Sequence, residues 1–171
     1  MISEYIKSVI SFAVLVLLQV LILNEVSLFD GWAQPYLYIY PIIALPLQIP
    51  NRILLPIGFL AGLTMDMFTH TPGIHASATL TLAFSRPYIL KSIRPREGFE
   101  SFTPSISSMG LVKYFTYSGL TVIIHHLWLF SLLYFSSGLL FIALGHALLS
   151  ALFTLVFILL IQFFSQPKKA F

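Results

Sequence analysis

The chain has 171 residues, of which 58% are apolar and only 9% are charged, and its mean hydropathy is +0.93. A soluble domain carries roughly 25% charged residues, so this composition excludes an ordinary soluble protein and favours a membrane protein. The net charge of +3 is explained by basic residues flanking membrane spans, and no nucleic-acid partner is predicted. Cysteine is absent, which excludes disulfides and thiolate metal sites.

Apolar runs separated by short polar breaks predict six transmembrane helices in one domain covering residues 1–171. The predicted spans are 8–27, 36–50, 53–69, 74–90, 111–135 and 138–163, with a polar loop at 91–110. Six helices of about 20 residues fill ~120 residues and leave no room for a soluble domain. The first apolar run is long and lacks a small-residue cleavage site, so it is predicted to be an anchor rather than a signal peptide. The predicted fold class is an all-α polytopic membrane bundle.

If the chain crosses the membrane six times in this way, all nine Lys and Arg residues lie on one side of the membrane. They are Lys7, Arg52, Arg86, Lys91, Arg94, Arg96, Lys113, Lys168 and Lys169. The three opposite loops contain Glu25 and Asp30 but no Lys or Arg. Because cytoplasmic loops are enriched in Lys and Arg, both ends of the chain are predicted to be cytoplasmic.

The second predicted span is interrupted by prolines. They are Pro35, Pro41, Pro46 and Pro50. An interior proline removes a backbone hydrogen bond, and at membrane depth the freed carbonyl needs a partner from protein or water. We therefore expect other helices to cover this segment, or the segment to line a cavity. Its aromatic residues are interpreted as a belt at the outer membrane interface; they are Trp32, Tyr36, Tyr38 and Tyr40.

The third span carries the densest pattern, since Gly58, Gly62 and Asp66 follow one another at intervals of four and share one helix stripe. Two glycines at this spacing allow a second backbone to approach closely. The fourth span is rich in Ala, Ser and Thr and is the simplest partner. Asp66 is expected on this packed stripe, because a carboxylate facing lipid costs several kcal/mol.

Asp66, His70 and His75 are predicted to converge at one outer turn, around Gly73. A metal site and a proton path are two alternatives for such a group. The favoured interpretation is structural: Asp66 would join the two helices by hydrogen bonds to backbone amides near Gly73 or to the His75 ring.

Three further histidines lie in the last two spans. His125 and His126 point about 100° apart on a helix, so we predict that they do not serve one site together. His125 and His146 lie at similar depths, which predicts a structural polar pair across the two spans. The chain contains no Ser–His–Asp order, glycine-rich phosphate loop or HExxH motif. No catalytic residue, metal or cofactor is predicted.

The run from Gln19 to Glu97 resembles the MreD family, in particular its Bacteroidetes branch. The resemblance rests on QVLILN, PYLYIY, the stripe of Gly58, Gly62 and Asp66, and TPGIHASA followed by Arg86-Pro87. The positions that match the motif of the family are Gly58, Gly62, Asp66, Gly73 and His75. The remaining spans match only in length and hydrophobicity.

This resemblance implies a non-enzymatic scaffold of the cell-elongation complex in the bacterial inner membrane, supporting lateral peptidoglycan synthesis and cell shape. The implied partners are an MreC-like bitopic protein, MreB-like filaments, a SEDS glycosyltransferase and a class-B penicillin-binding protein. It also implies a fold similar to the substrate-binding subunits of energy-coupling-factor transporters.

Two other functions compete with the scaffold. One is a vitamin-binding subunit of an energy-coupling-factor transporter, which would present an AxxxA-type motif on its first span; the residues around Ala13 form none. The other is a small membrane enzyme, which would need paired acids or a Ser/His/Asp set near one face. Asp66 is the one interior acid of the predicted spans, so the scaffold is favoured.

Overall fold

The computed structural model describes residues 2–26, 28–93 and 103–165, and this part of the chain folds into helices. The elements in chain order are α1 (Ile2–Leu18) with its π-helical continuation η1 (Gln19–Leu23), the 3₁₀ helix η2 (Leu37–Ile39), α2 (Tyr40–Ile43), α3 (Asn51–Thr69), α4 (Ile74–Ile93), α5 (Ile106–Met109), α6 (Leu111–Leu133), the 3₁₀ helix η3 (Phe135–Ser137) and α7 (Leu140–Phe164). The predicted all-α class is confirmed.

Three of the described helices, α3, α6 and α7, are long and apolar enough to cross a membrane. Many large apolar side chains point outward from them, as Met67, Val112 and Phe141 do with exposed fractions of 73%, 78% and 93%. An aqueous surface would not tolerate so much exposed apolar area, so the structure is compatible with the predicted membrane protein.

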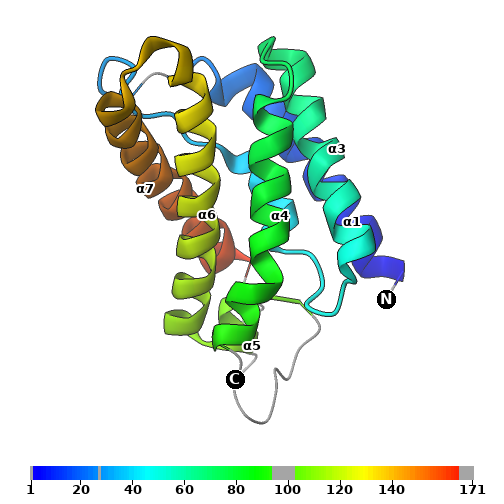
Figure 1. Ribbon diagram of the computed structural model, residues 1–171. Helices are drawn as coiled ribbons and strands as arrows, with labels where there is room; N and C mark the ends of the chain where they lie inside the picture. Colours follow the sequence, from blue (N-terminus) through cyan, green and yellow to red (C-terminus); the bar gives the residue numbers. More distant parts are fainter. Residues whose placement is uncertain (1, 27, 94–102, 166–171) are drawn as a thin grey trace.

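The long helices form a chain of antiparallel neighbours. α3 packs along α4, α4 along α6, and α6 along α7, while α1 contacts η2 and α2 (Figure 1). The loop that joins α3 to α4 lies at the upper end in that view, together with the one that joins α6 to α7. Each of these four helices corresponds to one predicted span, with boundaries that differ by a few residues.

The predicted second span is wrong as a membrane helix, because residues 36–50, here called the buried segment, form only η2, the four-residue α2 and an irregular stretch. Pro41 lies in the first turn of α2, where its missing N–H costs little, and Pro46 follows the end of α2, as prolines often do. Prolines at these positions set both ends of a very short helix.

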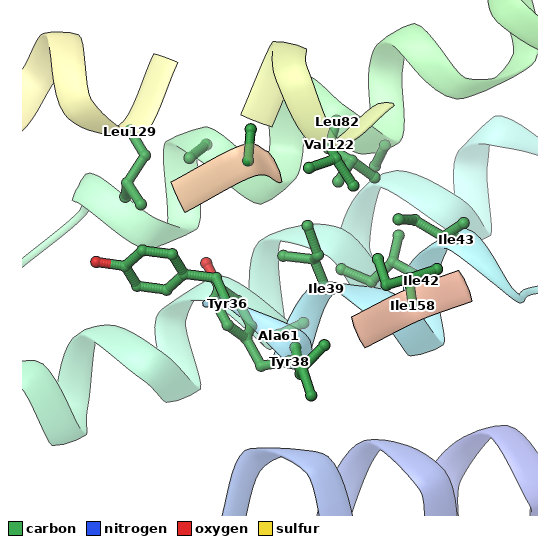
Figure 2. Close-up of a cluster of buried hydrophobic side chains, with 14 of the residues drawn as sticks. Tyr36, Tyr38, Ile39, Ile42, Ile43, Ala61, Leu82, Val122, Leu129 and Ile158 are labelled. Atoms are coloured by element: carbon green, nitrogen blue, oxygen red, sulfur yellow. The ribbon is translucent and has the colours of Figure 1, made fainter. Parts of the chain in front are cut away.

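Other helices cover the buried segment, as expected for a proline-broken stretch. Ile39, Ile42 and Ile43 are at most 1% exposed. Figure 2 shows their side chains in one cluster with Leu82 and Val122 of the surrounding helices. The segment therefore forms part of the core of the bundle.

The interpretation of the tyrosines as an interfacial belt is also wrong. Tyr36 and Tyr38 are 6% and 0% exposed, and both hydroxyl groups form hydrogen bonds to polar side chains of the protein. Trp32, by contrast, is 44% exposed. Alternating tyrosines are typical of an interfacial belt, but here the hydroxyl groups of Tyr36 and Tyr38 form hydrogen bonds within the protein.

Candidate functional site

The glycine stripe of α3 packs against α4, as predicted. A Cβ atom at Gly58 would lie 2.7 Å from the Cβ of Ala83. A Cβ atom at Gly62 would overlap the Thr79 side chain, the His75 carbonyl and the Cα of Ala76. Both glycines are therefore required by the close approach of the two backbones.

Asp66 lies at the end of this stripe and binds the start of α4. Its Oδ1 accepts hydrogen bonds from the Thr71 hydroxyl at 3.0 Å and the His75 amide at 2.9 Å. Its Oδ2 accepts hydrogen bonds from the Gly73 and Ala76 amides at 3.1 and 2.9 Å. The first amides of a helix have no partner within it and carry partial positive charge, so a carboxylate suits them well. The predicted bonding of Asp66 to backbone amides near Gly73 is confirmed.

His70 does not join Asp66. α3 ends at Thr69, and His70 takes a left-handed conformation with φ of 55° as its C-cap, so its side chain leaves the stripe and is exposed. Asp66 is 4% exposed. Within the described part of the chain, no group of three or more His, Asp or Glu side chains is arranged to hold a metal ion.

The His75 ring binds a tyrosine rather than Asp66. The Tyr38 hydroxyl lies 2.9 Å from His75 Nδ1 and 3.0 Å from His125 Nε2. His75 and His125 are 2% and 0% exposed. The buried segment thus brings α4 and α6 together through one hydroxyl group.

The two neighbouring histidines of α6 lie close together but form hydrogen bonds to different groups. Their ring centroids are 5.1 Å apart, and both rings contact Tyr36. His126 is further held by the Val122 carbonyl at 2.8 Å and the Thr154 hydroxyl at 3.0 Å. Tyr36, a residue of the buried segment, thus contacts both rings although they leave the helix about 100° apart.

The predicted pair of His125 with His146 is not formed, since His125 is bonded to Tyr38 instead. His146 stacks on Trp32, with ring centroids 4.7 Å apart and planes inclined by 3°, and lies 5.2 Å from the Tyr134 ring. Similar depth in two adjacent helices did not determine which residues face each other.

The prediction for Arg86 is also wrong, because Arg86 lies inside the bundle and not on the basic flank. It is 1% exposed, and its Nη2 donates to the carbonyl oxygens of Leu45 and Pro46, the latter at 3.2 Å. Its Nε donates to the Tyr117 hydroxyl at 2.7 Å, which in turn donates to the Ile43 carbonyl at 2.7 Å. Arg86 and Tyr117 thus supply donors to three carbonyls of the buried segment, of which that of Pro46 also accepts from the Ile49 amide at 3.4 Å.

Of the other residues predicted on the basic flank, Arg52 and Lys91 are exposed, and Arg94 and Arg96 lie outside the described residues. α4 continues through Pro87 to Ile93, so the helix does not end near Arg86.

Polar side chains of α7 and η1 hold the start of the buried segment. Gln19 donates to the Pro35 carbonyl at 3.0 Å and accepts from the Leu37 amide at 2.8 Å. Thr154 accepts a hydrogen bond from the Tyr36 amide at 2.9 Å. Neither Thr154 nor Tyr117 is predicted from the sequence; the need to satisfy backbone groups near the prolines is the signal that points to such residues.

No protein family, curated protein or solved structure matches this chain. The fold and the site define an all-helical protein with helices able to cross a membrane, whose interior polar groups bind a proline-broken segment.

Proposed function

We propose that this protein is a non-catalytic scaffold of the bacterial cell-elongation complex, located in the inner membrane and supporting lateral peptidoglycan synthesis and cell shape. Its proposed partners are an MreC-like bitopic protein and, with it, MreB-like filaments, a SEDS glycosyltransferase and a class-B penicillin-binding protein. The basis is the MreD-like motif in the first four predicted spans.

The contacts of the motif residues support a structural role. Gly58 and Gly62 permit contact between α3 and α4, and Asp66 binds the amides of Gly73 and His75. Four donors surround the Asp66 carboxylate, so its oxygens are engaged inside the protein. Such a set builds a rigid hairpin, which suits a protein that holds partners in place.

A genetic experiment tests this function. Depletion of the protein is expected to convert rod-shaped cells into rounded, swollen cells, and re-expression should restore the rods. The tagged protein should co-purify in detergent with an MreC-like protein. Unchanged rods after depletion, with no such partner recovered, would contradict the proposal, and a vitamin bound to the purified protein would favour the transporter alternative.

We further propose six passages through the membrane with both ends of the chain in the cytoplasm. Residues 28–50, which include the buried segment, lead from the end of the bundle reached by α1 to the end where α3 starts (Figure 1), and we count them as one passage although they do not form a membrane helix. α3 and α4 then run in opposite directions, as do α6 and α7.

Reporter fusions test this topology. Fusions after Lys169 and within 94–104 are expected to report the cytoplasm, and fusions near Asp30 or Ser137 should report the opposite side. The expectation follows from the one-sided distribution of Lys and Arg. A fusion after Lys169 that reports the outside would require an odd number of passages and would exclude the proposed topology.

A further inference from the structure

Two lysines lie at adjacent ends of neighbouring helices. Lys91 is in the last turn of α4 and Lys113 is in the first turn of α6, and both side chains are exposed. α4 ends and α6 begins at the lower end of the bundle in Figure 1, and the two helices pack along each other. The two lysines therefore belong to one end of a single pair of helices.

The register of this helix pair places the two lysines at about the same depth. Nε of Arg86 in α4 donates to the Tyr117 hydroxyl of α6 at 2.7 Å, so these two residues lie nearly level. Lys91 lies five residues beyond Arg86, towards the lower end. Lys113 lies four residues beyond Tyr117 in the same direction. Because a helix rises about 1.5 Å per residue, the two positions differ in depth by only ~1.5 Å.

The helices around the two lysines carry no acidic residue that could pair with them. α4, α5, α6 and α7 contain no Asp or Glu. The one acid of α3 is Asp66, which is buried and binds the start of α4 at the opposite end of the bundle. Residues 94–102 lie outside the described residues, and in the sequence they contain two Arg and two Glu, so they add no net charge. The described part of the α4–α6 pair therefore ends in a positive surface.

Apolar side chains continue from the lysines along the outward faces of both helices. On α4, Tyr88 and Phe84 share the face of Lys91, are 60% and 55% exposed, and have ring centroids 5.3 Å apart. On α6, Leu120 shares the face of Lys113 and is 41% exposed. From the end of the bundle inwards, the surface thus changes from cationic to apolar within about two helical turns.

We propose that Lys91 and Lys113 together bind the phosphate group of one anionic phospholipid, whose acyl chains lie along Phe84 and Leu120. A phospholipid has the same order of chemistry as this surface, with its phosphate at the membrane interface and its apolar chains further in. Lysines near the ends of membrane helices extend their ammonium groups to the interface, and basic residues there attract anionic lipids. The inference requires only that α4 and α6 lie in a membrane, and it does not depend on the proposed scaffold function.

Native mass spectrometry of the full chain tests this lipid site. The protein is purified in a mild detergent and equilibrated with equal amounts of phosphatidylglycerol and phosphatidylcholine, which both carry a phosphate but differ in net charge. The wild-type protein is expected to retain phosphatidylglycerol in preference. In the double variant Lys91→Gln/Lys113→Gln, retention of phosphatidylglycerol should fall about 25-fold, since each lysine near an anionic lipid contributes a factor of about five.

Arg52→Gln is the matched control for the single variants Lys91→Gln and Lys113→Gln. Arg52 is exposed in the first turn of α3, at the same end of the bundle, but α3 is not part of the α4–α6 pair. Each single lysine variant should lose about fivefold in retention, whereas the control should lose little. Substitutions at such exposed positions usually leave stability almost unchanged, and thermal unfolding checks this. Equal retention of the two lipids by the wild-type protein, undiminished retention in the double variant, or an equal loss in Arg52→Gln would overturn the proposal.

Discussion

Gly62→Leu is expected to remove most of the folded protein. A Cβ atom at this position would already overlap the Thr79 side chain and the backbone of His75 and Ala76, and a leucine adds three more carbon atoms. α3 and α4 would have to separate, which would also pull Asp66 away from the amides that it binds. We expect a loss of about 3 kcal/mol or more, a large part of the stability of a typical protein.

Detergent extraction followed by size-exclusion chromatography and thermal unfolding measures this effect. Leu60→Ala is the matched control, since Leu60 lies two residues away on the same helix but is 58% exposed. A substitution away from packed or polar contacts usually changes stability by about 0.5 kcal/mol or less. Normal accumulation and activity of Gly62→Leu would contradict a packed glycine stripe.

The hairpin of α3 and α4 could be predicted from the sequence because its features are local. The interval of four between Gly58, Gly62 and Asp66 defines one helix face whatever the rest of the fold does. The cost of exposing a carboxylate to lipid then requires this face to be the packed one. The alanine- and serine-rich helix that follows after a short turn is the nearest partner, and the structure pairs them.

The role of Arg86 could not be predicted in the same way. Its carbonyl partners, Leu45 and Pro46, lie about forty residues earlier in the chain, and no local spacing relates them. A topology prediction from the distribution of Lys and Arg assumes that every basic residue flanks a membrane span. A guanidinium group can instead donate hydrogen bonds to several buried carbonyls. The proline-broken segment presents carbonyls to the surrounding helices, but the donor that binds them could not be identified from the sequence.

The surroundings of His125 and His126 could not be predicted, for a geometric reason. The angle between His125 and His126 describes the directions in which they leave one helix. It does not describe a side chain such as Tyr36, which contacts both rings from another segment. Contacts of this kind depend on the path of the buried segment, which local periodicity did not reveal because the segment lacks regular structure.

Substitution of Asp66 is the second change expected to have a large effect, and the structure predicts how the Asp66 variants rank in stability. All four partners of the carboxylate are donors, two on each oxygen. Asp66→Asn replaces one oxygen by an NH₂ group, which faces two donors and can accept from neither. Asp66→Leu removes all four acceptor contacts. We therefore expect Asp66→Asn to be clearly destabilised and Asp66→Leu to be worse.

The magnitude follows from the donors left without a partner. Each buried donor that loses its acceptor costs about 1–3 kcal/mol, so two such donors make Asp66→Asn a substantial loss of about 2–6 kcal/mol. Thermal unfolding in one detergent, together with the amount of protein in the membrane, gives the ranking of wild type, Asn and Leu. His70→Asn is the control, since His70 is exposed and asparagine accepts its left-handed backbone.

The stability and the function of these variants must be measured separately. If Asp66 acts only by holding the start of α4, loss of cell shape should follow the loss of folded protein, and Asn should retain more of both than Leu. Equal and complete loss of function in both variants, with normal protein levels and normal partner binding, would contradict the structural role. The carboxylate charge itself would then be required, and ion or proton chemistry at Asp66 would replace helix pairing as its function.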